Sequence, residues 1–157
     1  MKQITSEQAF IRLSNYCSRT ERCIFDIRRK LMAWEIPGNE QNQIIKKLQQ
    51  EKFLNESRYC RAFVNDKSKY NRWGAYKIKV ELMKKQISED LIREALENLQ
   101  PEETLEQLCR LLEQKKKSVK GKNDFEIKQK LMRFAAGRGF SQEDVEKALF
   151  ILGKNFF

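Results

Sequence analysis

The chain has 157 residues, a formal net charge of +10 and no histidine. Charged residues make up 34% and hydrophobic residues 40%, so a core can form, but the charged surface is large for the volume. This balance favours an elongated helical protein, and two prolines and six glycines are typical of helices joined by short turns. Without histidine the chain lacks the usual neutral-pH general base, the usual Ser or Cys triad and most catalytic zinc sites.

Four cysteines are spread along the chain with no CxxC pair: Cys17, Cys23, Cys60 and Cys109. Their spacing fits no zinc motif, so we expect reduced thiols in a cytoplasmic protein and no cofactor. The N-terminal residues are charged without an apolar signal-peptide core. No apolar run approaches the roughly 20 residues of a membrane span. We therefore expect no signal peptide and no membrane partner.

One pattern occurs three times: aromatic, any residue, Ile, basic, two variable residues, Leu, Met. It reads FDIRRKLM from Phe25, YKIKVELM from Tyr76 and FEIKQKLM from Phe125. Such a repeat indicates similar structural units, each with this motif in the middle one of three helices. We place the units at residues 1–54, 55–100 and 101–157. The predicted fold is all-α, with three tandem three-helix repeats.

In the first unit, apolar residues at helical spacing predict a helix over 6–17. Ser18 with Glu21 resembles a capping box, which we expect to open the motif helix. The Ile-Pro-Gly sequence at 36–38 ends that helix, and a third helix follows over 39–50.

In the second unit, Asn55 is the expected N-cap of a helix over 56–70. After a break at NRWG, the motif helix covers about 74–86. Ser88 caps the third helix, which runs to 99.

In the third unit, Pro101 occupies a favoured first helical position. The basic stretch KKKSVKGKN is expected to form a loop before Asn123, which caps the motif helix. This loop is either a solvated basic segment or an arm that contacts phosphates. Gly137 and Gly139 end the motif helix, and Ser141 caps the last one.

The motif helix has two apolar stripes when its residues are placed about 100° apart. Ile and Leu form one stripe, which we expect to fill the core of its own unit. The aromatic and Met form the other, which either packs in the core or between units, or faces a partner. The shared basic residue lies between the stripes, as Arg28, Lys79 and Lys128. Either its stem covers apolar surface, or the three residues form a row of cations.

A second candidate site surrounds the second motif, where basic and aromatic residues alternate in KYNRWGAYKIK. Such interleaving suits phosphate contact supported by stacking or cation–π interactions. The alternative is a helix start whose aromatics fill the seam between units. Each of the three units has a net positive charge, so the whole body would attract a polyanion such as nucleic acid or a nucleoprotein.

Four stretches of the chain resemble the RecX family of RecA regulators: FDIRRKL, FLNESRYCRAFVNDK, RWGAYKIKVELMKKQIS and LIREAL. The second stretch is the most specific, and the match is weaker in the third unit. Three positions depart from the family pattern. Asn55 replaces the commoner acid, Cys60 the commoner Ala, and Gln86 stands where the family often has Gly.

The resemblance implies a curved, elongated helical array that binds the RecA–DNA filament. It implies a regulator, not an enzyme, that inhibits RecA recombinase and coprotease activity and so modulates DNA repair and the SOS response. We expect a monomer with RecA as its partner, and with single- or double-stranded DNA as a further candidate. The candidate contact residues are Arg28, Arg72, Trp73, Tyr76, Lys77, Lys79 and Lys128. The alternative is a helical-repeat DNA- or RNA-binding protein that acts without RecA.

Overall fold

The computed structural model describes residues 4–153 and 156–157, which contain nine α-helices and no strand. The helices are α1 (Ser6–Arg19), α2 (Ile24–Ala33), α3 (Gly38–Gln50), α4 (Glu56–Lys69), α5 (Ala75–Lys84), α6 (Glu89–Leu96), α7 (Pro101–Lys116), α8 (Asp124–Gly137) and α9 (Gln142–Leu152). The extensive helix–helix contacts lie within the groups α1–α3, α4–α6 and α7–α9. We call these groups units 1, 2 and 3. The all-α prediction is confirmed.

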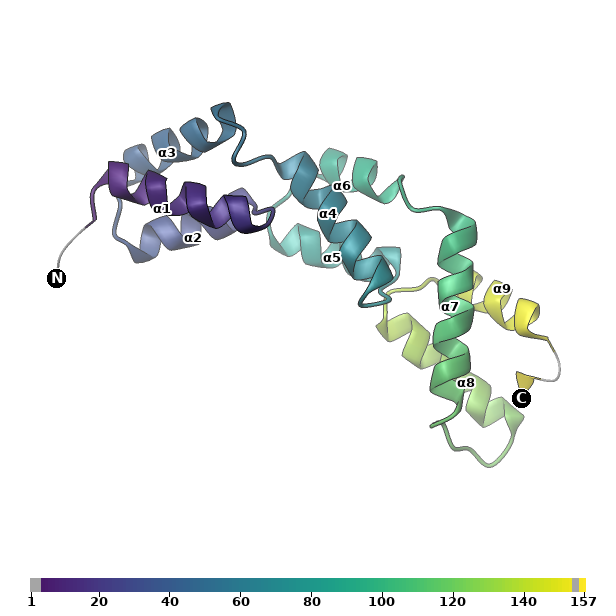
Figure 1. Ribbon diagram of the computed structural model, residues 1–157. Helices are drawn as coiled ribbons and strands as arrows, with labels where there is room; N and C mark the ends of the chain where they lie inside the picture. The colour runs from purple at the N-terminus through teal and green to yellow at the C-terminus, as the bar shows by residue number, and fades with distance from the viewer. Residues whose placement is uncertain (1–3, 154–155) are drawn as a thin grey trace.

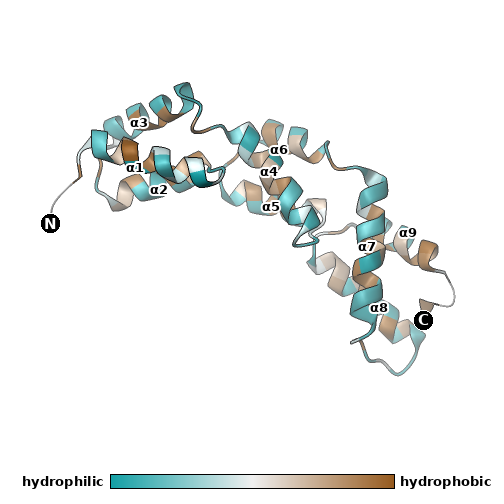
Figure 2. Ribbon diagram, viewed as in Figure 1, coloured by the Kyte–Doolittle hydropathy of each residue, from teal (hydrophilic) through white to brown (hydrophobic). Residues whose placement is uncertain are grey.

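The three units follow one another along a curved array, with the two termini at opposite ends (Figure 1). The motif helices α2, α5 and α8 lie one after another along the lower edge of the curve in this view. Hydrophobic and hydrophilic positions alternate around each helix (Figure 2), as expected for small units that bury one helix face.

Each unit has its own cluster of buried apolar side chains. The motif's Ile and Leu lie at the centre of these clusters. Five of the six are fully buried, and Ile127 is partly buried against the unit 3 cluster. The five are Ile27, Leu31, Ile78, Leu82 and Leu131. The prediction that this stripe fills the core of its own unit is confirmed.

Local side-chain chemistry sets most of the helix starts. Asn55, Ser88, Asn123 and Ser141 each accept a hydrogen bond from the backbone N–H three residues ahead, as predicted. The predicted cap at Ser18 is wrong. Ser18 lies in the last turn of α1, where its hydroxyl donates to the carbonyl of Asn15, and α2 begins only after Cys23.

Each motif helix is followed by a residue in the left-handed backbone region and then by a buried apolar residue. The left-handed residues are Glu35 (φ 59°), Gln86 (φ 58°) and Gly139 (φ 95°). Because a Cβ is strained there, Gly is the favoured residue, and Glu35 and Gln86 adopt this backbone conformation with a side chain in place. α8 has 14 residues where α2 and α5 have 10, so its left-handed turn comes one helical turn later.

Units 1 and 2 meet through side chains at the start of α2. Cys23 is fully buried in the core of unit 2. The N–H of Ile24 donates to the carboxylate of Glu56 (3.0 Å), and the ammonium of Lys85 contacts Asp26 (2.8 Å). Glu21, which does not serve as a cap, accepts from Arg58 of unit 2 (2.9 Å). The segment between α1 and α2 therefore joins two units instead of capping a helix.

Units 2 and 3 meet through the backbone. The N–H of Gly74 donates to the carbonyl of Arg138 (2.7 Å), and the N–H of Tyr76 donates to the carbonyl of Gly139 (3.1 Å). A Cβ on Gly74 would lie 2.4 Å from the Gly139 oxygen, and one on Gly139 would lie 2.4 Å from the Lys77 Cβ. The unpaired N–H groups at the start of α5 thus bind carbonyls at the end of α8.

The same arrangement occurs at both junctions: the start of one motif helix meets the end of the next unit's motif helix. α2 meets α5 through Asp26 and Lys85, and α5 meets α8 through the two glycines. This is why the three motif helices lie end to end (Figure 1).

Adding a methyl group to either junction glycine is expected to disrupt the unit 2–unit 3 contact. Gly74→Ala or Gly139→Ala should lower the free energy of unfolding by about 2 kcal/mol or more, because backbone atoms on both sides would have to separate. Urea unfolding followed by circular dichroism measures this. Gly137→Ala is the control, since nothing lies within 4 Å of a Cβ there and Ala favours the helix. Equal stability of the Gly137→Ala and Gly139→Ala variants would contradict the close approach.

Glu56 makes the stability of the unit 1–unit 2 junction depend on pH. Burial raises the pKa of its carboxyl above the ordinary 4.5, and the hydrogen bond from the Ile24 N–H only partly opposes this. A raised pKa means that folding disfavours the carboxylate. Its destabilising effect is absent below pH 4.5 and grows as the pH rises through the folded-state pKa.

Glu56→Gln keeps an acceptor for the Ile24 N–H and removes this charge. We expect the variant to be at least as stable as the parent at pH 7, with the difference in stability shrinking as the pH falls towards 4.5. Urea unfolding at several pH values measures the difference, and Glu51→Gln, on an exposed side chain, is the control. A Gln variant that loses stability relative to the parent as the pH rises would show that the carboxylate itself stabilises the junction.

Candidate partner-binding surface

The second apolar stripe of the motif helices lies mostly on the surface. Tyr76 is 71% exposed, Phe125 69% and Met32 63%, and Met83 is also exposed. Phe25 packs partly against the unit 2 core, and the Met of the third motif packs partly against the unit 3 core. Two of the six aromatic and Met side chains are thus partly packed, and the four exposed ones are available to a partner.

In every unit, the motif aromatic and the shared basic residue line the same surface hollow. Phe25 and Arg28 line a hollow of about 280 Å³. Tyr76 and Lys79 line one of about 560 Å³, and Phe125 and Lys128 line one of about 700 Å³. We call these motif hollows 1, 2 and 3. The repeated sequence therefore builds a repeated surface feature, an aromatic ring beside a cation.

The walls of the motif hollows follow from the end-to-end arrangement. Motif hollow 1 is completed by Lys85 and Gln86 at the end of α5. Motif hollow 2 is completed by Gly139 and Phe140 after α8. Motif hollow 3 has no further unit beside it among the described residues, and α9 and Phe157 complete it. The first two therefore open at the junctions between units.

The three shared basic residues are not equivalent. Arg28 is half-buried and donates to Asn42 Oδ1 (3.1 Å) and Gln41 Oε1 (3.5 Å), which ties α2 to α3. Lys79 and Lys128 are exposed, and neither belongs to any of the ion pairs among the described residues. Two of the three residues are thus free surface cations, while Arg28 also holds its own unit together.

Some residues of the KYNRWGAYKIK stretch pack against the unit 2 core, and others lie on the surface. Trp73 is half-buried in the unit 2 core, with its ring centre 6.4 Å from that of Phe63. The ammonium groups of Lys67 and Lys77 lie 4.9 Å and 4.6 Å from the Trp73 ring centre. Trp73 therefore serves mainly to pack against the unit 2 core, and Lys77 covers the Trp73 ring. Tyr76 faces the solvent, as a contact residue would.

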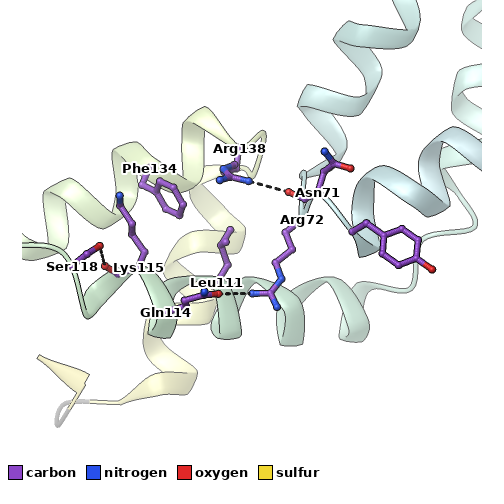
Figure 3. Close-up of a pocket in the computed structure, with 9 residues that line it drawn as sticks. Asn71, Arg72, Leu111, Gln114, Lys115, Ser118, Phe134 and Arg138 are labelled. Atoms are coloured by element: carbon purple, nitrogen blue, oxygen red, sulfur yellow. Dashed lines mark hydrogen bonds between the residues drawn. The ribbon is translucent and has the colours of Figure 1, made fainter.

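Arg72 lines none of the three motif hollows. Its backbone is left-handed (φ 54°), and its guanidinium donates to Gln114 Oε1 of α7 (3.1 Å). With Lys115 and Arg138 it lines a separate pocket at the unit 2–unit 3 junction (Figure 3). Lys115 belongs to the basic stretch that the sequence offers as a possible phosphate-contacting arm. We did not predict Arg138 from the sequence, because it lies in another unit and belongs to no copy of the motif.

The thiols are poorly suited to nucleophilic or metal chemistry. All four cysteines are free and buried. Burial raises the pKa of the Cys23 and Cys60 thiols to about 11, so little thiolate forms at neutral pH. In the described part of the chain, no group of three or more His, Cys, Asp or Glu side chains could hold a metal ion. Nor is any helix there long and apolar enough to cross a membrane.

Comparisons with known proteins support one family. A model of the second three-helix domain of RecX matches residues 55–96, and a model of the third matches residues 102–149. Together these ranges cover more than half of the chain and contain most of units 2 and 3.

Two relatives illustrate the sequence similarity, and both carry the name Regulatory protein RecX. The protein from Bacillus pumilus (strain SAFR-032) is 31% identical, over 91% of this chain and 54% of the relative. The protein from Clostridium perfringens (strain 13 / Type A) is 27% identical, over 91% of this chain and 69% of the relative. The chain thus spans about half the length of the Bacillus relatives that it matches.

Two crystal structures share the fold. RecX from Lactobacillus salivarius has a TM-score of 0.84 at 21% identity, over 94% of this chain and 96% of that chain. A second structure, of regulatory protein RecX, has a TM-score of 0.84 at 24% identity, over 91% of this chain and 72% of that chain. These structures confirm the helical-repeat fold. The domain matches, the relatives and the array of three-helix units together show that this chain belongs to the RecX family of regulatory proteins.

Proposed function

We propose that this protein binds the RecA–DNA filament and inhibits the recombinase and coprotease activities of RecA, and so regulates DNA repair and the SOS response. Membership of the RecX family gives the regulatory role. The observation that carries the mechanism is the set of three motif hollows on a curved tandem array. We place the three units at residues 1–54, 55–100 and 101–157.

A filament is a regular repeat of one protein subunit. An array of similar units can contact several of these subunits at once. Each motif hollow offers an aromatic ring and a cation, which suits a partner segment with an apolar and an acidic side chain. When one unit has bound, the others are held close to their own sites, so individually weak contacts add up to firm binding.

Charge assists this binding without requiring catalysis. The net charge of +10 is spread over all three units, which attracts the chain to a filament that contains DNA. In this mechanism inhibition follows from binding alone, because a chain lying on several RecA subunits restricts their movement and their access to DNA or to a coprotease substrate. We infer a cytoplasmic monomer that acts without a cofactor.

The test is to titrate this protein into RecA strand-exchange and DNA-dependent ATP-hydrolysis reactions. Inhibition is expected at or below one protein per RecA subunit. No effect at a one-to-one ratio would contradict the proposal. Tight, salt-sensitive binding to naked DNA, together with no effect on either RecA reaction, would favour the alternative, a helical-repeat protein that binds DNA or RNA without RecA.

The free lysines of motif hollows 2 and 3 are expected to contribute to filament binding. Lys79→Gln with Lys128→Gln should raise the concentration needed for half-inhibition of RecA about tenfold, equivalent to about 1.4 kcal/mol. Neither side chain is buried, so thermal unfolding should change little.

Lys46→Gln with Lys52→Gln is the matched control, because it removes two exposed lysines outside the three motif hollows. This control should shift half-inhibition by less than about threefold, the size of a general charge effect. Equal losses in both double variants would show that only the total charge matters.

A further inference from the structure

The pocket at the unit 2–unit 3 junction, which we call the junction pocket, is separate from the motif hollows. It has a volume of about 410 Å³ and lies between the α4–α5 connection, α7 and α8. Nine residues line it (Figure 3). Three of them, Arg72, Lys115 and Arg138, carry positive charge, and none is acidic.

Each of the three cations is held in place by contacts within the protein. Arg72 donates to Gln114 Oε1 (3.1 Å), and Arg138 Nη1 donates to the carbonyl of Asn71 (3.0 Å). The guanidinium carbon of Arg138 lies 5.2 Å from the centre of the Phe134 ring, and the ammonium of Lys115 lies 4.8 Å from it. The cations come from units 2 and 3, and the backbone contact between those units brings them together.

These contacts leave most of the hydrogen-bonding capacity unused. A guanidinium has five N–H donors, and each arginine uses one of them in the contacts named above. None of the three cations belongs to an ion pair among the described residues. Like charges that share a pocket repel one another, and an anion bound between them would remove that repulsion.

A phosphate group suits the junction pocket better than a single carboxylate, because three cations line the pocket and phosphate has more acceptor oxygens. Phosphate offers several acceptor oxygens, which match the two planar guanidinium forks and the ammonium group. Tyr70 also lines the pocket and is 81% exposed, which leaves its ring available for stacking with a base. The basic stretch from Lys115 to Lys122 continues beyond the pocket and could meet the next phosphates of the same strand.

We propose that the junction pocket binds a backbone phosphate of a nucleic-acid strand, with Arg72, Lys115 and Arg138 as its ligands. This contact is direct and does not depend on RecA. It therefore adds a nucleic-acid site to a chain whose motif hollows we assign to a protein partner.

The test measures binding of fluorescently labelled single-stranded oligo(dT) to the whole chain, without RecA, by anisotropy at several salt concentrations. Arg72→Gln with Lys115→Gln should weaken binding at least tenfold at low salt. It should also make the slope of log K against log[salt] shallower by about 0.7, which is the contribution of one phosphate contact in a single strand. Arg138 is left intact, because its guanidinium donates to a backbone carbonyl, that of Asn71, across the unit 2–unit 3 junction. Arg72→Gln also removes a contact across this junction, the one with Gln114, and thermal unfolding of the variant measures its effect on the fold.

Arg19→Gln with Lys46→Gln is the matched control. It removes one Arg and one Lys from exposed positions of unit 1 and so changes the net charge equally. We expect less than a threefold change in binding for this variant. Equal weakening in both double variants would overturn the proposal, because binding would then follow total charge alone. Thermal unfolding of each variant establishes that the fold is intact.

Competition with inorganic phosphate distinguishes the two sources of a phosphate ligand, a nucleic-acid strand and a small phosphate compound. We call Arg72→Gln with Lys115→Gln the pocket variant. A strand phosphate is supported as the ligand if inorganic phosphate competes with oligo(dT) only at millimolar concentrations, and does so in the parent but not in the pocket variant. Phosphate that raises the melting temperature of the parent but not of the pocket variant, while oligo(dT) does not bind, would overturn the assignment to nucleic acid. It would point to a small phosphate compound.

Discussion

The close backbone contact between Gly74 and Gly139 sets the arrangement of units 2 and 3, and both kinds of candidate site depend on that arrangement. Three-helix units of this size have small cores, so the shape of the array depends on how their ends meet. At this junction two glycines allow the start of α5 to bind carbonyls at the end of α8. The same contact sets the walls of motif hollow 2 and brings Arg72 of unit 2 close to Lys115 and Arg138 of unit 3. One close approach thus positions both kinds of candidate site.

The repeated motif combines a structural and a surface role in eight residues. Its Ile and Leu are core residues, while its aromatic and basic residues line a hollow in every unit. The structural role is nearly constant between copies. The surface role varies, since Arg28 is hydrogen-bonded within unit 1 and Lys79 and Lys128 are not engaged in ion pairs. Repetition therefore fixes the position of a side chain, and its neighbours decide what it does.

Features that depend on nearby residues could be predicted from the sequence. The core stripe and the N-caps at Asn55, Ser88, Asn123 and Ser141 are of this kind, because a helix start is set within three residues. The cap at Ser18 was wrong because Glu21, its expected partner, binds Arg58 of another unit.

The exposure of the second stripe could not be predicted, because a helical wheel gives directions and not neighbours. Nor could the junction pocket, since the separation between Arg72 and Arg138 along the chain says nothing of their distance in space. The roles of the seven candidate contact residues stay predictions. The structure separates those that face solvent, such as Tyr76 and Lys79, from those that pack, such as Trp73.

The two junctions differ in the kind of force that holds them. Between units 1 and 2 the contacts include the ion pairs of Arg58 with Glu21 and of Lys85 with Asp26, all partly exposed to solvent. Between units 2 and 3 they include backbone hydrogen bonds at glycines and the side-chain hydrogen bonds of Arg72 and Arg138, and no ion pair among the described residues. Dissolved salt screens partly exposed ion pairs but has little effect on hydrogen bonds between neutral amides. We therefore expect rising ionic strength to weaken the ion pairs at the unit 1–unit 2 junction and leave the backbone hydrogen bonds between units 2 and 3 unchanged. The buried Cys23 still packs in the unit 2 core at high salt and keeps unit 1 attached.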